Sequence, residues 1–294
     1  MLIFAELLLN GLTLGAFYAL VTLGLALIFG VVRLVNFAHG DFFMVGAYIL
    51  FLFSSTDSLK ALPYPIMVLA TVLAMIGFGV LFERVIVHRI IDRSWRVHLV
   101  ATLASSIILS NLALLIFSSD PKHIPTPYTR TFVEVGDIRT NIQRLIVVMV
   151  CILVYIGLQW FLHNTKTGKA MRAVSQNRDM CVVVGIDVQR ISVITFGISA
   201  GLAGLAAALL APLFTVLPYM GSLITLKAFT AVIMGGLGQL TGGFYAAFIL
   251  GLVESFFAGY VPGGFAYKDV VAFAVIILVL ILKPQGLFGR KIGI

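Results

Sequence analysis

Charged residues are scarce in this sequence, cysteines are few, and a nucleotide-binding signature is lacking. Only 11% of the residues are charged, and the two cysteines, Cys151 and Cys181, lie far apart. Two isolated cysteines give neither a disulfide framework nor a metal site. No stretch reads G-x-x-x-x-G-K-[ST], so we expect the chain to hydrolyse no nucleotide itself. No catalytic or zinc-binding arrangement stands out either, so we expect no enzyme, no bound cofactor and no metal.

What the sequence has in excess is apolar surface. Of its 294 residues 61% are hydrophobic, and the mean hydropathy is +1.10. A soluble domain cannot bury the apolar surface of so many hydrophobic residues, so the composition indicates a polytopic membrane protein. The apolar runs have helix length and do not alternate, so one all-α transmembrane bundle over 1–294 is favoured over a barrel. It has about eight or nine spans, one short or discontinuous, at 2–31, 37–53, 63–82, 99–118, 144–162, 192–217, 228–241, 243–260 and 268–283.

The basic residues predict which loops face the cytoplasm. Thirteen of the twenty Lys and Arg residues fall at Arg33, in the loops 83–98 and 163–191, and in the tail from Lys283. The positive-inside rule places these segments in the cytoplasm and the N-terminus outside. Lys227 and Lys268 are assigned to external loops. This topology requires 228–241 to cross the membrane, although its glycines also fit a re-entrant hairpin or a discontinuous transporter helix.

Two segments outside the spans stand out. The polar stretch Gly168–Arg190 alternates at helical spacing, which predicts a short amphipathic helix outside the bilayer. The external loop 119–143 is either a docking surface for a partner or a simple connection. Within the spans, Gly11-x-x-x-Gly15 and Gly197-x-x-x-Gly201 have the spacing of close helix packing or reflect ordinary glycine richness.

Among the polar side chains at or within the spans, four stand out: Asn36, His39, Asp41 and Glu254. Asp41 is expected in the first turn of a helix near the membrane interface, where it would cap free N–H groups. The alternative is that Asn36, His39 and Asp41 line or gate a solute path. Glu254 lies deeper and should face the bundle or a cavity. All four are candidates for the translocation path.

Five stretches in this order resemble one family. They are NFAHGDFFMVGAY at 36–48, FER at 82–84, GKAMRAVSQNRDMCVVVGIDVQRI at 168–191, FTAVIMGGLGQLTGG at 229–243 and KPQGLFGR at 283–290. They are similar to the branched-chain amino-acid ABC importer permeases of the LivH/LivM family, and specifically to the LivH-type subunit. The resemblance covers nearly the whole chain.

The resemblance implies a bacterial inner-membrane subunit that translocates leucine, isoleucine or valine by alternating access. It implies a LivM-type permease partner, two cytoplasmic ATPases (LivG- and LivF-type) that use ATP, and a periplasmic amino-acid-binding protein, with no nucleic acid. It also implies that the loop 163–191 couples to the ATPases through Gly168, Arg172, Ala173, Asn177, Gly185 and Ile186.

Other functions remain open at this point. Urea and short-amide permeases share many of these motifs. An ion-coupled secondary transporter would use buried acids, for which Asp41 and Glu254 are the candidates. A structural or assembly protein of the membrane makes no demand on the sequence.

Overall fold

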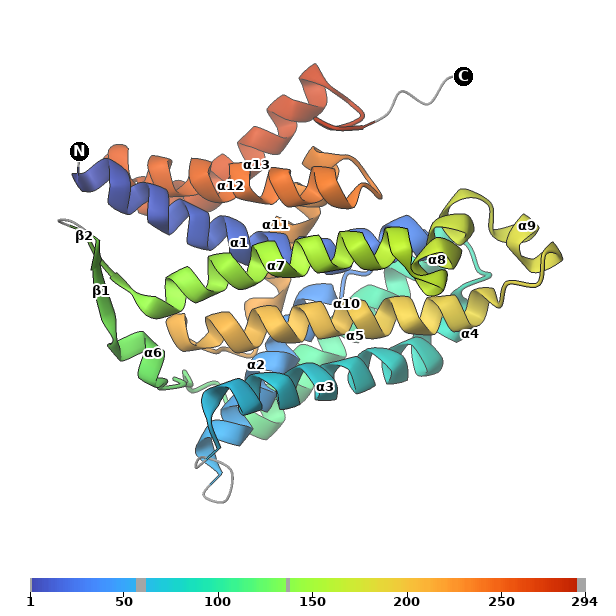
Figure 1. Ribbon diagram of the computed structural model, residues 1–294, viewed down its shortest axis with the longest axis horizontal. Helices are drawn as coiled ribbons and strands as arrows, with labels where there is room; N and C mark the ends of the chain where they lie inside the picture. Colours follow the sequence, from blue (N-terminus) through green and yellow to red (C-terminus); the bar gives the residue numbers. More distant parts are fainter. Residues whose placement is uncertain (1, 57–61, 136–137, 290–294) are drawn as a thin grey trace.

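The computed structural model describes residues 2–56, 62–135 and 138–289, which form a bundle of helices (Figure 1). Within these ranges seven helices are long and apolar enough to cross a membrane. They are α1 (Leu2–Val32), α3 (Tyr64–Phe82), α5 (Trp95–Phe117), α7 (Ile142–Asn164), α10 (Val188–Leu210), α12 (Leu240–Tyr260) and α13 (Gly264–Leu282). Two shorter apolar helices are α2 (His39–Ser55) and α11 (Met220–Gly235). The all-α polytopic bundle expected from the sequence is confirmed.

The remaining elements lie at the two ends of the bundle. They are η1 (Glu83–Val87, a π-helical turn), α4 (His88–Ile90), α6 (Pro127–Arg130), β1 (Phe132–Val135), β2 (Ile138–Asn141), α8 (Lys166–Gln176), α9 (Arg178–Val183) and η2 (Ala211–Leu213). Figure 1 shows α4, α8 and α9 at one end, called here the α9 end. The N-terminus and the antiparallel β1–β2 pair lie at the other, the hairpin end. The loops 83–98 and 163–191, both predicted to be cytoplasmic, therefore share an end, and the cytoplasmic assignment of the α9 end stays a prediction.

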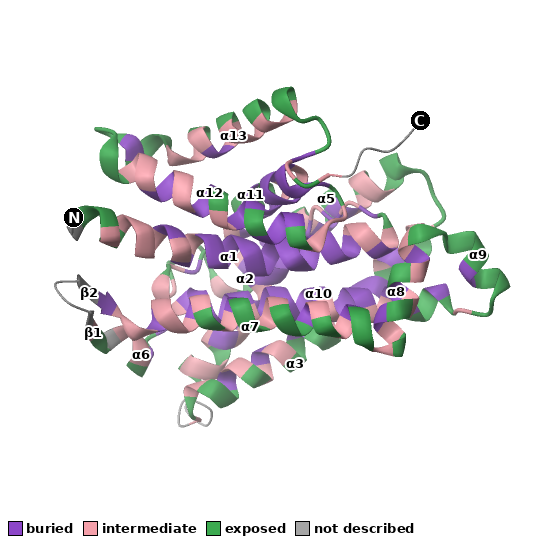
Figure 2. Ribbon diagram, turned by 45° about the horizontal axis from the view of Figure 1, so that its top comes forward, coloured by how far each residue is buried: buried purple, intermediate pink, exposed green. Residues whose placement is uncertain are grey.

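The bundle has a buried centre and an apolar rim. In its most apolar stretch α1 is 83% buried and α10 is 78% buried, whereas α13 is only 6% buried. Figure 2 shows the buried residues concentrated on α1, α2 and α10, with exposed residues along α13. Apolar faces of this size need a covering of lipid or protein. The rim helices thus supply the surface that meets the membrane or another subunit.

Two helices, α2 and α11, are too short to span the bilayer. With 17 and 16 residues, at 1.5 Å per residue they extend about 25 Å, against about 30 Å of hydrocarbon. The chain enters them through the non-helical segments 33–38 and 214–219. Non-helical backbone at membrane depth requires protein partners. Side chains supply them: Asn36 Oδ1 accepts from Ala38 N, and Thr225 Oγ1 donates to Phe37 O.

The expected crossing at 228–241 has the wrong bounds. The helix α11 begins eight residues earlier, at Met220, and ends at Gly235. Gly236 and Gly238 have φ values of +105° and +77° and turn the chain into α12. Lys227 caused the error: it was assigned to an external loop, yet it lies inside α11 and is 3% exposed. The span 192–217 likewise ends early, at Leu210, before Pro212.

The same order of elements occurs twice, in opposite directions. A long helix, a non-helical segment, a short helix and a long helix follow one another as α1, 33–38, α2 and α3, and again as α10, 214–219, α11 and α12. Opposed repeats of this kind are common in transporters. The halves interlock through glycines.

Glycine packing joins α1 to α12 and α10 to α3. A Cβ on Gly15 would lie 2.8 Å from Phe248 Cα, and a Cβ on Gly201 would lie 2.9 Å from Ile76. Both distances are shorter than Cβ atoms adopt. A side chain at Gly15 would therefore run into the backbone of α12, and one at Gly201 would force the Ile76 side chain to move. The pair at 11 and 15 therefore does serve helix packing. Of the pair at 197 and 201 only Gly201 does, because a Cβ on Gly197 would make ordinary contacts at 3.4 Å or more.

Candidate functional site

The predicted coupling segment forms two helices at the α9 end. The helix α8 is amphipathic as expected, because Met171 and Val174 are buried and Arg172 is exposed. Thr165 Oγ1 accepts a hydrogen bond from Gly168 N and caps its start. A side chain on Gly168 would collide with Phe161 O of α7. Gly168 therefore lets α8 lie directly against the end of α7.

The second helix, α9, is held at both ends by the residues that the sequence singled out. Asn177 ends α8, and its Oδ1 accepts from Met180 N at the start of α9. Gly185 has φ +81°, and Ile186 N donates to Cys181 O at 2.8 Å. This is the Schellman arrangement, which favours glycine at the left-handed position. Asn177, Gly185 and Ile186 thus set the shape of α9.

The outer surface of α9 is apolar and uncovered. Met180, Val182, Val183 and Val184 are 62%, 62%, 80% and 71% exposed. Figure 1 shows α9 projecting beyond the ends of the long helices. A contiguous apolar patch on a projecting polar segment is typical of a protein-binding surface. We call these four residues the α9 patch.

Two contacts fix the orientation of this segment relative to the bundle. Arg33 Nη2 donates to Ser175 O at 3.0 Å, which satisfies a carbonyl at the end of α8. Arg178 pairs with Asp92 at 3.0 Å. Of the six predicted coupling residues, Arg172 is exposed and Ala173 is half-buried. Their coupling role stays a prediction.

The N-termini of α2 and α11 meet inside the bundle, where Asn36, His39 and Asp41 are fully buried. His39 Nε2 lies 3.0 Å from Val21 O, at the middle of α1. Asp41 Oδ1 accepts from Ser110 Oγ at 3.1 Å. The structure therefore brings three of the four path candidates into one polar junction.

The expected position of Asp41 needs two corrections. It lies in the first turn of α2, but no side chain caps that helix. Asp41 instead lies against Gly221, in the first turn of α11, where the positive end of the helix dipole favours a carboxylate. The junction also lies within the bundle and not near its end, because segment 33–38 carries the chain back inward.

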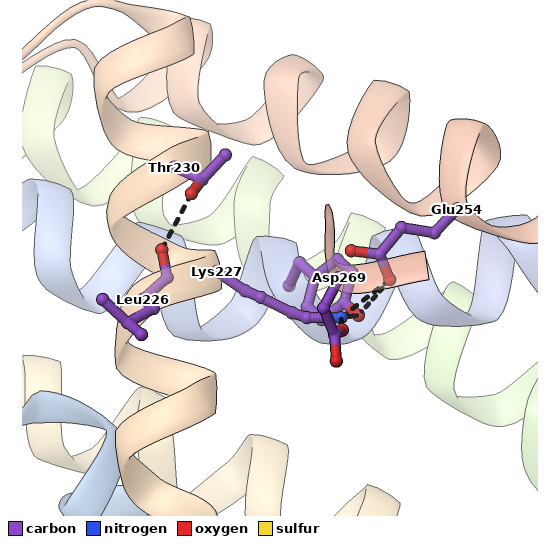
Figure 3. Close-up of polar contacts among 6 residues, drawn as sticks. Leu226, Lys227, Thr230, Glu254 and Asp269 are labelled. Atoms are coloured by element: carbon purple, nitrogen blue, oxygen red, sulfur yellow. Dashed lines mark hydrogen bonds and ion pairs between the residues drawn. The ribbon is translucent and has the colours of Figure 1, made fainter. Parts of the chain in front are cut away.

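Glu254 belongs to a separate buried network centred on Lys227 (Figure 3). Lys227 Nζ donates to Glu254 Oε2 at 2.9 Å and to the Tyr18 hydroxyl at 2.8 Å. The Tyr18 hydroxyl in turn donates to Glu254 Oε2 at 2.7 Å. Lys227 Nζ also lies 2.8 Å from Asp269 Oδ1. The network joins α1, α11, α12 and α13, and it carries two carboxylates for one ammonium.

Sequence reasoning missed Lys227 and Asp269 in this network. It assigned Lys227 to an external loop, and it counted Asp269 with the external charges at the start of the expected span 268–283. The available signal was the need of Glu254 for a partner, since an acid inside a membrane helix is almost always paired. Lys227 stands in the apolar run LITLKAFTAV, which pointed to it. Among the described residues no group of three or more His, Cys, Asp or Glu side chains could hold a metal ion.

Comparison with known proteins gives consistent matches along the chain. Residues 7–280 match the family described as "Branched-chain amino acid transport system / permease component". The high-affinity branched-chain amino acid transport system permease protein BraD of Pseudomonas aeruginosa is 36% identical, over 96% of this chain and 95% of that protein. LivH of Escherichia coli, a permease protein with the same description, is 30% identical, over 98% and 96%. A probable LivH of Methanocaldococcus jannaschii is 28% identical, over 92% and 88%. No solved structure matches.

Proposed function

The chain belongs to the family of permease components of branched-chain amino acid transport systems, and we propose that it is the LivH-type membrane subunit of an ABC importer. It moves leucine, isoleucine or valine across the bacterial inner membrane by alternating access. A LivM-type permease completes the path, and a periplasmic binding protein delivers the amino acid. LivG- and LivF-type ATPases at the α9 end hydrolyse the ATP, so that end is cytoplasmic.

The observation that carries this proposal is the α9 patch. The sequence has no Walker motif, so another subunit must bind and hydrolyse ATP and act on the bundle through a contact. The α9 patch is exposed, apolar and rigidly capped at Asn177 and Gly185. A capped helix transmits a push as a unit, whereas a loose loop absorbs it. ATP binding can shift the bundle only if the ATPases contact its states differently, and the α9 patch is where that contact is made.

The proposal is tested by assembling the chain with a LivM-type permease and both ATPases in vesicles. We expect ATP-dependent uptake of leucine when the binding protein is present. Val183→Asp should lower both stimulated ATP hydrolysis and uptake, because a carboxylate in an apolar interface is costly. Val183→Ile keeps the surface apolar and is the matched control.

Two variants address the predicted coupling residues themselves. Ala173→Asp adds a charge to a half-buried position of α8, and Gly185→Trp disrupts the left-handed cap of α9. Normal ATP turnover and normal uptake in both variants would refute the coupling role. Uptake that follows an ion gradient in vesicles without ATPases would instead favour a secondary transporter.

A further inference from the structure

We propose that a cavity beside Lys227 binds the branched-chain amino acid as a zwitterion during its passage, an inference that rests on the proposed function. The cavity has a volume of about 230 Å³ and lies between α1, α2, segment 211–219 and α11. At about 30 Å³ for each water molecule it could hold seven or eight waters. That is the scale of a small metabolite, below that of a drug-sized ligand.

The walls of the cavity suit an aliphatic side chain. Phe17 of α1 stands among aromatic neighbours, with ring centroids 5.1 Å from Phe43 of α2 and 6.1 Å from Phe214. Leu223 and Ile224 of α11 complete the apolar lining. Phe214 and Leu223 are 44% and 45% exposed in this chain, so a ligand can still cover them. Such walls reject a charged side chain, because it would lose its hydration without gaining a partner.

The cavity also offers a cation for a carboxylate. Lys268 of α13 lines it, and across the described part of the chain Lys268 has no hydrogen bond or ion pair. Its Nζ lies 4.5 Å from the centre of the Phe265 ring. An ammonium with three N–H donors and no anionic partner is suited to hold a carboxylate.

The Lys227 network supplies the opposite charge. Lys227 lines the cavity together with Tyr18, but its ammonium is shared between Glu254 and Asp269. With all three groups ionised, the network carries one surplus negative charge. Glu254 Oε1 has no hydrogen-bond partner although it is buried. An amino acid that binds Lys268 through its carboxylate would place its ammonium group near the Lys227 network. The positive charge of that ammonium group would neutralise the surplus negative charge of the network.

The position of the cavity fits the first stage of import. Its lining residue Val216 pairs with Lys122 by two backbone hydrogen bonds of 3.0 and 3.1 Å. Lys122 belongs to the segment that leads to the β1–β2 pair, at the hairpin end. That end is predicted to be external, so an amino acid released by a binding protein meets this cavity before the polar junction of α2 and α11.

Transport by the assembled complex gives the first test. Leu223→Trp fills the cavity and should lower L-leucine uptake about tenfold or more, because the ligand loses its space. The control is Leu226→Trp, on the same helix and 46% exposed but outside the lining, which should leave uptake within about twofold. Lys268→Gln should raise the half-saturating leucine concentration about tenfold, the loss expected for a charged hydrogen bond, whereas Lys283→Gln should not. Equal uptake by Leu223→Trp and the parent would overturn the site, as would equal impairment by Leu226→Trp.

Protection from labelling tests occupancy without relying on transport. Thr215→Cys puts a thiol on the cavity wall, while the native Cys151 and Cys181 are buried and set the background with an impermeant thiol reagent. L-leucine at ten times its half-saturating concentration should slow labelling about tenfold, L-glutamate should not, and Leu226→Cys should be unaffected.

The two proposals fail in different ways. An unchanged labelling rate at leucine concentrations that saturate uptake would refute the cavity and leave the importer function intact. Protection without any uptake by the parent complex would refute the function and leave the cavity.

Discussion

Replacing Lys227 by methionine tests how this bundle tolerates charge in its interior. The ammonium lies 2.9 Å from Glu254, and the two side chains are only 4% and 1% exposed. Lys227→Met keeps the volume but leaves Glu254 buried without compensation. Breaking a buried pair in this way costs about 3–5 kcal/mol. Asp269 is 37% exposed, so solvent screens it and its share is below about 1 kcal/mol.

A double-mutant cycle separates the pair from the packing. Glu254→Gln alone should cost less than Lys227→Met, because Lys227 keeps Asp269 as a partner. The double variant Lys227→Met/Glu254→Gln should lose less stability than the sum of the single losses, with a coupling of about 2 kcal/mol. Lys268→Met is the control, since Lys268 has no ion pair among the described residues.

The assay is the thermal unfolding midpoint of the purified protein in detergent. At 2 °C or more for each kcal/mol, Lys227→Met should lower the midpoint by at least about 6 °C. A Lys227→Met midpoint equal to that of Lys268→Met would refute the argument. So would single losses that simply add, because independent groups do not form a network.

Two further predictions concern glycines. Gly40→Ala should destabilise the protein by about 1–3 kcal/mol or prevent its folding, because the added methyl would collide with Gly221 O and overpack the junction. Gly77→Ala in α3, where a Cβ meets nothing within 4 Å, is the control in the same unfolding measurement, and equal midpoints would contradict the close approach. Gly185→Ala should strain the left-handed cap of α9 by about 1–2 kcal/mol and lower stimulated ATP hydrolysis without moving the midpoint of the bundle. Gly157→Ala, also free of contacts, should leave hydrolysis unchanged, and the cap has no role in coupling if both variants behave alike.

Apolar length and helical period were sufficient to predict the long helices and the amphipathic character of α8. The single helix expected at Gly168–Arg190 is instead two helices, α8 and α9, which Asn177 separates. The bounds of α1, α12 and α7 lie within a few residues of those expected. An uninterrupted apolar run of that length can satisfy its backbone in a membrane only as a transmembrane helix. The packing of Gly15 and Gly201 also followed from spacing. Sequence periodicity reports which face of a helix meets an apolar environment. For these helices that environment is lipid or the bundle core along the whole length.

The short helices could not be predicted in the same way. Their limits depend on partners distant in sequence: Gly40 N is satisfied by Thr225, and Lys227 is compensated by Glu254. Taken alone, a lysine such as Lys227 predicts a loop outside the membrane. Paired with Glu254, the same lysine can lie in the interior of the bundle. The reversal at 33–38 is hidden for the same reason, since its backbone groups are satisfied by side chains from other helices, such as Thr102.

The contact between Gly40 and Gly221 has a consequence for movement. No side chain stands between these two backbones, so neither short helix can slide past the other without a collision. Pulling them apart would strip Gly40 N of its hydrogen bond to Thr225 in a setting where water cannot replace it. Rotation about the point of contact causes no collision and keeps the hydrogen bond of Gly40 N. We therefore expect the point where the N-termini of α2 and α11 meet to act as a pivot, about which the two short helices can tilt without sliding or separating.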